Sequence, residues 1–223
     1  MAIFSFKALW ENWRDDVAAR NEYTNLRSNF ESSFESLSEP TIPDQAETRI
    51  DMSHFSAINP DFVGWISIAG TSVSYPVVQG RDNEQYLGTT FRGEQNPAGA
   101  IFMDYRITQT FDAPVTILHG HNMRDGSMFA SLAKYLDPAF LSDHPEITVV
   151  TATGETLIYE VFHARQTTGW DPVYALDFSA TVETAPADAH RILLMSTCTG
   201  DGDSDARVLV YAISHTRTID ENV

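Results

Sequence analysis

The sequence contains a single cysteine, Cys198, among 223 residues, so no disulfide can form within the chain. Basic residues are also scarce, because 14 lysines and arginines stand against 31 aspartates and glutamates, for a net charge of −17. This balance argues against a protein that binds nucleic acid or anionic lipid through a basic surface. The longest apolar run, residues 208–213, is far shorter than the roughly 18–20 residues of a membrane span.

Several other features are missing. Residues 1–7 lack the charged start and the apolar stretch of a signal peptide. We therefore expect either a cytosolic protein or a chain whose export and anchoring segment has been removed. The sequence contains no G-x-S-x-G, Walker, G-x-G-x-x-G or H-E-x-x-H motif, and Cys198 lacks the papain and caspase contexts. A hydrophobic content of 43% is nevertheless enough for one sizeable core.

The N-terminal region predicts an amphipathic helix or a helical pair that packs on the main domain. Apolar residues recur three or four positions apart at Phe6, Leu9, Trp10, Trp13, Val17, Tyr23, Leu26, Phe30, Phe34 and Leu37. Acidic residues between them argue against a helix that lies on an anionic membrane. Two prolines within residues 38–44 predict a linker. We therefore divide the chain into a helical extension with its linker, residues 1–45, and a main domain, residues 46–223.

The main domain has the pattern of short strands. The predicted strands are residues 63–68, 73–77, 100–103, 115–119, 147–151, 156–163, 191–198 and 207–215. Residues 152–155 predict a hairpin, and residues 128–136 have helical spacing. Seven or eight strands with one or two short helices between them predict a mostly β domain, either a barrel or a sandwich. The long irregular segment 166–190 is typical of a binding surface.

Cys198 is the first candidate for chemistry. It ends an apolar strand and is followed by the polar residues 199–205, so it is either a nucleophile at a solvent boundary or an inert core cysteine. A thiol with a pKa of roughly 8.5 needs a nearby cation and a base. A hairpin would bring Arg207 beside Cys198, where its guanidinium could stabilise a thiolate or an oxyanion. Alternatively, Arg207 balances the neighbouring aspartates.

The base must be one of seven histidines, of which His119 and His121 at a strand end stand out. Two histidines at this spacing could be metal ligands, but a zinc site needs further ligands, and none follows at short spacing. We therefore expect neither a metal nor a cofactor. The other interpretation makes one of the two a general acid and base for Cys198.

Six sequence blocks together resemble the sortase family, and class B sortases in particular. The blocks are LHGHNMRDGSMF at 118–129, STCT at 196–199 with DAR at 205–207, NPDFVGWI at 59–66, YPVVQG at 75–80, DNEQYL at 82–87 and IFMDY at 101–105. They follow one another in the family's order and span about residues 46–215. The resemblance implies an eight-stranded sortase-type β-barrel, preceded by N-terminal α-helices and with one or two short helices between strands.

The same resemblance assigns roles to individual residues. It implies that Cys198 is the nucleophile of a cysteine transpeptidase, His121 its general acid and base, and Arg207 the stabiliser of the oxyanion. His119 is then a structural strand residue. In the same way, the resemblance implies that Asn83, Leu87 and Ser196 belong to the groove that binds the sorting signal.

The resemblance also implies a substrate and a location. The substrate would be a sorting signal of secreted surface proteins, for which class B sortases suggest the Asn-Pro-x-Thr-x type, cleaved after threonine and transferred to an amine of a peptidoglycan precursor. Alternatives are a pilin-polymerising sortase that uses a lysine amine, a thiol protease that uses water, and a catalytically silent barrel that binds peptides or a metal through His119 and His121. No nucleic acid is implied.

Two departures from the family pattern affect these expectations. Class B sortases carry a long helix before the cysteine strand, and residues 167–191 are too short for a full version, so one wall of the groove differs. Sortases also carry a membrane anchor. The resemblance therefore implies a fragment from the extracellular face of the bacterial membrane whose anchor is absent.

Overall fold

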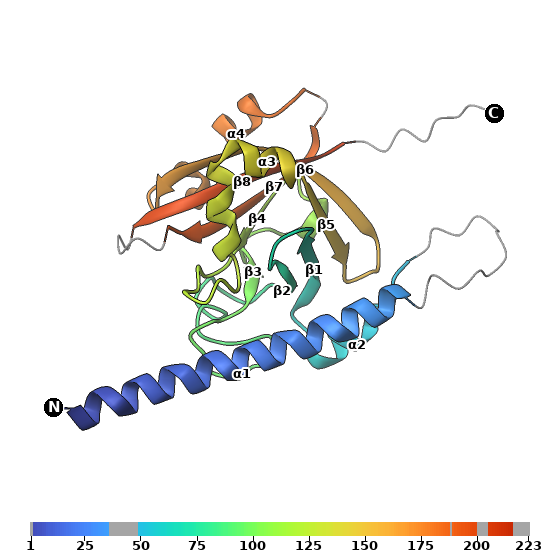
Figure 1. Cartoon of the computed structure of the whole chain (residues 1–223). Coiled ribbons are helices and arrows are strands. Elements are labelled where there is room, and N and C mark those ends of the chain that lie inside the picture. The colour runs from blue at the N-terminus through green and yellow to red at the C-terminus, as the bar shows by residue number, and fades with distance from the viewer. Residues whose placement is uncertain (1, 36–48, 188, 200–204, 216–223) are drawn as a thin grey trace.

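A computed structural model describes residues 2–35, 49–187, 189–199 and 205–215 (Figure 1). Its centre is a closed eight-stranded barrel in the order β1-β2-β3-β4-β7-β8-β6-β5. The strands are β1 (Phe62–Ile68), β2 (Ser74–Val78), β3 (Ile101–Met103), β4 (Val115–His119), β5 (Glu146–Thr151), β6 (Thr156–Thr168), β7 (Ala189–Cys198) and β8 (Ala206–His215). The pairs β2–β3 and β4–β7 are parallel and the others antiparallel. The predicted mostly β barrel is therefore confirmed.

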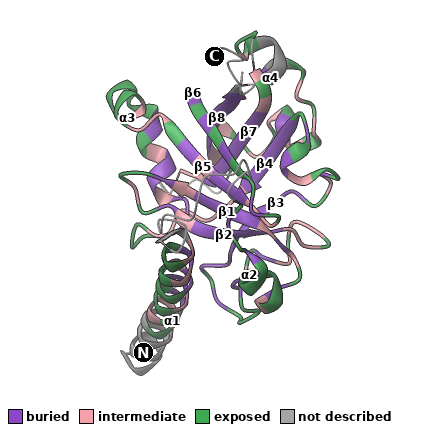
Figure 2. Ribbon diagram, turned by 90° about the vertical axis from the view of Figure 1, so that its right-hand side faces the viewer, coloured by how far each residue is buried: buried purple, intermediate pink, exposed green. Residues whose placement is uncertain are grey.

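Helices lie outside the barrel. They are the α-helices α1 (Ala2–Glu35), α2 (Ser53–Ile58), α3 (Pro138–Asp143) and α4 (Ser179–Thr184), and the 3₁₀ segments η1 (Thr110–Asp112), η2 (Ala130–Leu136) and η3 (Pro172–Ala175). The strands are mostly buried, whereas α2 and the outer face of α1 are exposed (Figure 2). Apolar side chains thus fill the barrel, and the helices cover part of its outer surface.

Four neighbouring strands bring their functional ends to one place. In β4 and β7, His119 is the Cα partner of Ser196. In β7 and β8, Cys198 is the partner of Arg207, and in β8 and β6, Arg207 is the partner of Thr167. Because directly opposed residues on neighbouring strands project to the same face, this register decides which side chains meet.

α1 packs along one side of the barrel against β2, and its N-terminal end extends beyond the barrel (Figure 1). Its buried residues Ala19, Tyr23, Leu26 and Phe30 recur at helical spacing. Phe30 stacks on Trp65 of β1 with ring centroids 4.4 Å apart. The predicted packing of this helix on the main domain is therefore found in the structure.

Some boundaries differ from the predictions. β6 continues five residues beyond the predicted end at 163, because its second half pairs with β8 as far as Thr168. The helical spacing of 128–136 corresponds to a 3₁₀ segment, η2. The predicted linker 38–44 and the domain boundary after residue 45 lie outside the described residues, as does Leu37. No helix among the described residues is long and apolar enough to cross a membrane.

Candidate active site

A cavity of about 320 Å³ opens where β4 and β7 end and β8 begins. Its lining includes every residue that the sequence predicts for the site, namely Asn83, Leu87, His121, Ser196, Cys198 and Arg207. Phe102, His119, Gly120, Gly169, Tyr174 and Thr197 complete it. Residues that are distant in the sequence are thus gathered around one half-buried thiol.

Cys198 and Arg207 form the last rung of the β7–β8 ladder. The ladder closes beyond them with a hydrogen bond of 3.2 Å from the Thr199 N–H to the Ala206 carbonyl. The Arg207 guanidinium donates to the same carbonyl through Nη1 at 3.1 Å. The sequence prediction that a hairpin places this arginine beside the thiol agrees with this register.

The segment after β4 holds His121. The Gly120 N–H donates to the Ser196 carbonyl at 3.2 Å, and the Phe129 N–H donates to the His121 carbonyl at 2.9 Å. The His121 ring contacts the Leu87 carbonyl through Nε2 at 2.8 Å. Because a carbonyl oxygen only accepts, Nε2 carries a proton here, and Nδ1 is the nitrogen left for proton exchange.

Asn122 is a site residue that the sequence analysis did not assign. Its amide donates to the Cys198 carbonyl at 2.9 Å and so joins the segment after β4 to the end of β7. The residue lies in the HGHN motif, directly after His121. That position beside a catalytic candidate was the only signal in the sequence that could have identified it.

His119 and His121 both line the cavity, but their rings contact different groups. The His119 ring lies between those of Phe102 and Tyr174, at centroid distances of 5.2 and 6.2 Å. Its Nε2 is 3.6 Å from a carboxylate oxygen of Asp104, whereas Nε2 of His121 contacts Leu87. The Nε2 atoms of the two rings thus lie against different residues. Within the described part of the chain, no three His, Cys, Asp or Glu side chains are grouped to hold a metal ion.

Asp104 is a buried charge behind the cavity, with 1% of its surface exposed. Arg106 donates to both carboxylate oxygens at 2.8 and 2.7 Å, and the Asn83 amide donates to one at 2.8 Å. Burial alone would raise the pKa of Asp104, but hydrogen bonds from Arg106 and Asn83, together with the nearby His119 ring, outweigh it and hold the pKa well below its usual range. The carboxylate therefore stays charged and holds Asn83 in place.

Tyr174 of η3 is a second site residue that the sequence analysis did not assign. Its hydroxyl forms a hydrogen bond of 2.7 Å with the Ser196 hydroxyl, and its carbonyl accepts from Arg106 at 2.9 Å. Burial raises the pKa of Tyr174, so the hydroxyl stays protonated. The residue lies in the irregular segment 166–190, which had only a general prediction of a binding surface. Among the described residues of this segment the structure has two short helices, η3 and α4, and no long helix.

Comparisons with known proteins agree with this geometry. Residues 66–214 match the model of the sortase domain. A sortase B from Listeria monocytogenes is 36% identical, with 70% of each chain covered. The structure of a Staphylococcus aureus sortase B–substrate complex superposes with a TM-score of 0.75 at 29% identity, covering 92% of this chain and 100% of that one.

A Streptococcus pyogenes class B sortase involved in pilus biogenesis is also similar, with a TM-score of 0.63 at 26% identity, covering 73% of this chain and 97% of that one. The domain match spans well over half of the chain. Both the curated relative and the solved structures belong to one class of the family. The chain therefore belongs to the sortase family of cysteine transpeptidases and is a class B-like member of it.

Proposed function

We propose that this sortase cleaves a sorting signal after threonine with Cys198 as nucleophile. The thiolate attacks the threonine carbonyl, and the C–N bond breaks as His121 gives a proton to the leaving amine. The product is a thioester between Cys198 and the threonine. The register that sets Cys198 opposite Arg207, in the cavity that also contains His121, carries this proposal.

Arg207 is the main donor for the oxyanion in this proposal. Backbone N–H groups are common oxyanion donors in acyl transfer. However, the N–H of Thr199, which follows the nucleophile, already donates to the Ala206 carbonyl. A guanidinium on the same face as the thiol supplies both a positive charge and hydrogen-bond donors where negative charge develops.

The second half-reaction transfers the acyl group to an amine of a peptidoglycan precursor. The amine attacks the thioester, His121 takes its proton, and the Cys198 thiolate leaves. A thioester transfers its acyl group to an amine without ATP, which suits an enzyme that acts at the extracellular face of the membrane. A lysine of a pilin would resolve the same intermediate, but the site offers no feature that favours it.

We propose that Asn83, Leu87 and Ser196 contact the sorting signal. Asn83 and Leu87 line the cavity from the loop after β2, and Ser196 lines it from β7. The Asn83 amide is oriented at both ends, because its carbonyl accepts from the Tyr105 N–H at 3.1 Å while its NH₂ group binds Asp104. This polar arrangement beside the exposed apolar Leu87 suits a signal of the Asn-Pro-x-Thr-x type.

Intact-mass measurement tests the proposal. The protein is incubated with a pool of threonine-containing sorting peptides, with the Cys198→Ala variant as control. An adduct on the wild type alone, discharged by added amine into a ligated product, supports a transpeptidase. Discharge by water alone would indicate a protease, and no adduct together with slow alkylation of Cys198 would indicate a catalytically silent barrel. Triglycine and a pilin-derived lysine peptide, supplied separately, compare the two acceptors.

A further inference from the structure

The middle of α1 contacts both segments that surround His121. We call residues 86–99 the groove loop and residues 120–128 the histidine loop. The Asn96 amide of the groove loop donates to the Asp15 carbonyl at 2.7 Å, and the Arg92 N–H donates to Glu22 at 3.0 Å. Arg20 pairs with Asp125 of the histidine loop at 3.0 Å. One helix thus contacts both loops.

Tyr23 makes the most buried of these contacts, with 5% of its surface exposed. Its hydroxyl donates to the Gly99 carbonyl at 2.6 Å and accepts from the Phe91 N–H at 3.3 Å. Burial raises the pKa of Tyr23 far above the neutral range, so the hydroxyl keeps the proton that it donates. The groove loop is therefore joined to α1 at a point from which water is excluded.

Gly99 transmits this contact to Leu87. Its φ of +57° favours glycine, and a Cβ atom at this position would lie 2.4 Å from the Tyr86 carbonyl oxygen and 2.8 Å from that of Leu87. The Gly99 backbone therefore packs directly against the Leu87 carbonyl. That carbonyl is the hydrogen-bond partner of His121 Nε2. Tyr23 is thus connected to the His121 ring through the backbones of two residues, Gly99 and Leu87.

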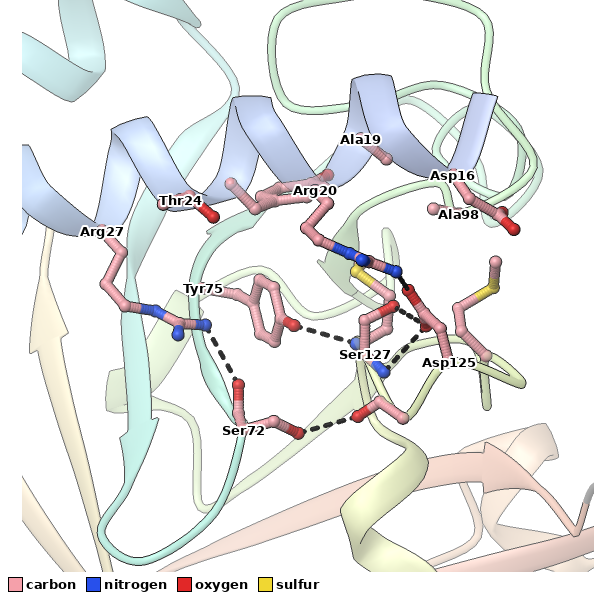
Figure 3. A pocket seen from close by; sticks show the side chains of 14 residues that line it. Asp16, Ala19, Arg20, Thr24, Arg27, Ser72, Tyr75, Ala98, Asp125 and Ser127 are labelled. Carbon is pink, nitrogen blue, oxygen red and sulfur yellow. Dashed lines mark hydrogen bonds and ion pairs between the residues drawn. The ribbon is translucent and has the colours of Figure 1, made fainter. Parts of the chain in front are cut away.

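The histidine loop has contacts of its own with α1 and with β2. Asp125 accepts from Arg20, while its second oxygen accepts from the Ser127 N–H and hydroxyl, as Figure 3 shows. The Met128 N–H donates to the Tyr75 hydroxyl at 2.9 Å, and Met128 pairs with Asn122 across the loop. α1 therefore contacts the histidine loop directly and reaches the His121 ring through the groove loop.

We propose that Tyr23 is a positioning residue for His121, and that docking of α1 sets the orientation of this ring toward the thiol. The inference rests on the proposed function, in which His121 transfers protons. The Leu87 carbonyl decides which ring nitrogen carries the proton and where the other nitrogen points. A displacement of about 1 Å in such a group is enough to cost about 100-fold in rate.

Tyr23→Phe tests the proposal because it removes the hydroxyl and keeps the ring. Tyr135→Phe is the matched control, since Tyr135 is also buried and its hydroxyl donates to the His144 carbonyl at 2.7 Å, outside the cavity. We expect both variants to melt about 2–4 °C lower. Only Tyr23→Phe should lower kcat about tenfold, with KM changed less than about twofold. It should also shift the pH dependence of Cys198 alkylation by iodoacetamide.

Alkylation of Cys198 is measured without peptide. It therefore tests the positioning role of Tyr23 independently of the proposed transpeptidase function. If the wild type forms no peptide adduct, the proposed function fails, and a shifted alkylation profile in Tyr23→Phe alone would still support the positioning role. Equal kcat values and equal alkylation profiles in the two variants would overturn the positioning role.

Arg20→Gln is a second variant that keeps the test decisive if Tyr23→Phe does not fold. The Arg20 side chain is 60% exposed, so its removal should hardly change stability. We expect a two- to threefold loss of kcat in Arg20→Gln. Adding Asp125→Asn should cause no further loss, because asparagine keeps one oxygen that can accept from Ser127 and loses only the ion pair with Arg20. Wild-type kcat in Arg20→Gln, or fully additive losses, would contradict the role of α1.

Discussion

At the scale of single residues, Arg106 joins the two walls of the cavity. Through Asp104 it is connected to Asn83, and its Nη2 also donates to the Tyr174 carbonyl. Tyr174 in turn binds Ser196. The guanidinium of Arg106 and the carboxylate of Asp104 therefore hold the loop after β2 at a defined distance from η3. No strand pairing joins these two segments, both of which the structure describes.

Arg106→Lys should widen this separation. Lysine keeps the positive charge beside Asp104 but cannot reproduce the two-pronged contact together with the bond to Tyr174. We expect KM for the sorting peptide to rise about tenfold while kcat changes less than about threefold, because only the walls of the groove move. Steady-state kinetics over a range of peptide concentrations measures both constants.

Arg191→Lys is the matched control for this variant. Arg191 pairs with Asp112 at 2.8 Å and neither residue lines the cavity. A similar drop in melting temperature in both variants, with KM raised only in Arg106→Lys, would support a role in the groove. An unchanged KM in Arg106→Lys would show that the separation of the walls does not depend on Arg106.

At the scale of elements, the junction between β4 and the histidine loop depends on Gly120. A Cβ atom there would lie 2.5 Å from Cδ1 of Ile101 and 2.7 Å from Cδ2 of Phe129. Both neighbours are fully buried, so they have little room to move. Any side chain at this position must therefore push the loop that carries His121 away from the barrel.

Gly120→Ala should destabilise the protein by about 1–3 kcal/mol through overpacking and lower kcat at least tenfold. Gly88→Ala is the steric control, because a Cβ atom there meets nothing within 4 Å. Urea unfolding gives the first quantity and peptide turnover the second. Wild-type turnover in a Gly120→Ala protein that is destabilised as expected would mean that His121 tolerates movement of its loop.

Sequence patterns predicted the strands well because alternation and turn residues are local. The hairpin at 152–155 is one example, since a short loop leaves few registers for its two strands, and the pairing of Cys198 with Arg207 is another. The contacts of Asn122 and Tyr174 could not be predicted in the same way. Each joins segments 76 or 22 residues apart, and their distance depends on how the whole barrel closes. Likewise, helical spacing in 128–136 did not distinguish an α-helix from the 3₁₀ segment η2.

At the scale of the whole molecule, acid acts on stability in two opposite ways. Protonation reduces the net charge of −17 and so relieves repulsion between acidic groups. Against this, the folded state holds the pKa values of Asp104, Asp125 and Asp171 below their ordinary value, because hydrogen bonds from their neighbours outweigh the effect of burial. The unfolded chain therefore binds more protons at these groups below about pH 4.

A comparison of variants separates these two effects, because a single substitution hardly changes the overall charge. Folding lowers the pKa of Asp104. Its charge therefore contributes fully to the free energy of unfolding above the ordinary aspartate pKa, and this contribution is lost as the pH falls toward the pKa of Asp104 in the folded state. The Asp104→Asn variant lacks this contribution at every pH, because asparagine carries no charge. It should thus be less stable than the wild type at pH 7, and its stability should fall less steeply below pH 4, by up to about 1.4 kcal/mol per pH unit.

Urea unfolding at several pH values between 7 and 2.5 measures this difference, with Asp143→Asn as the control at an exposed position of α3. The curves of the wild type and Asp104→Asn should approach each other as the pH falls, because protonation of this carboxylate in the unfolded wild-type chain stabilises the unfolded state while the folded state keeps the carboxylate charged. The control should stay close to the wild type throughout. If instead the Asp104→Asn curve runs parallel to that of the wild type down to pH 2.5, the loss at neutral pH comes from packing and not from the charge of Asp104, and the acid sensitivity of the barrel must then arise at other carboxylates.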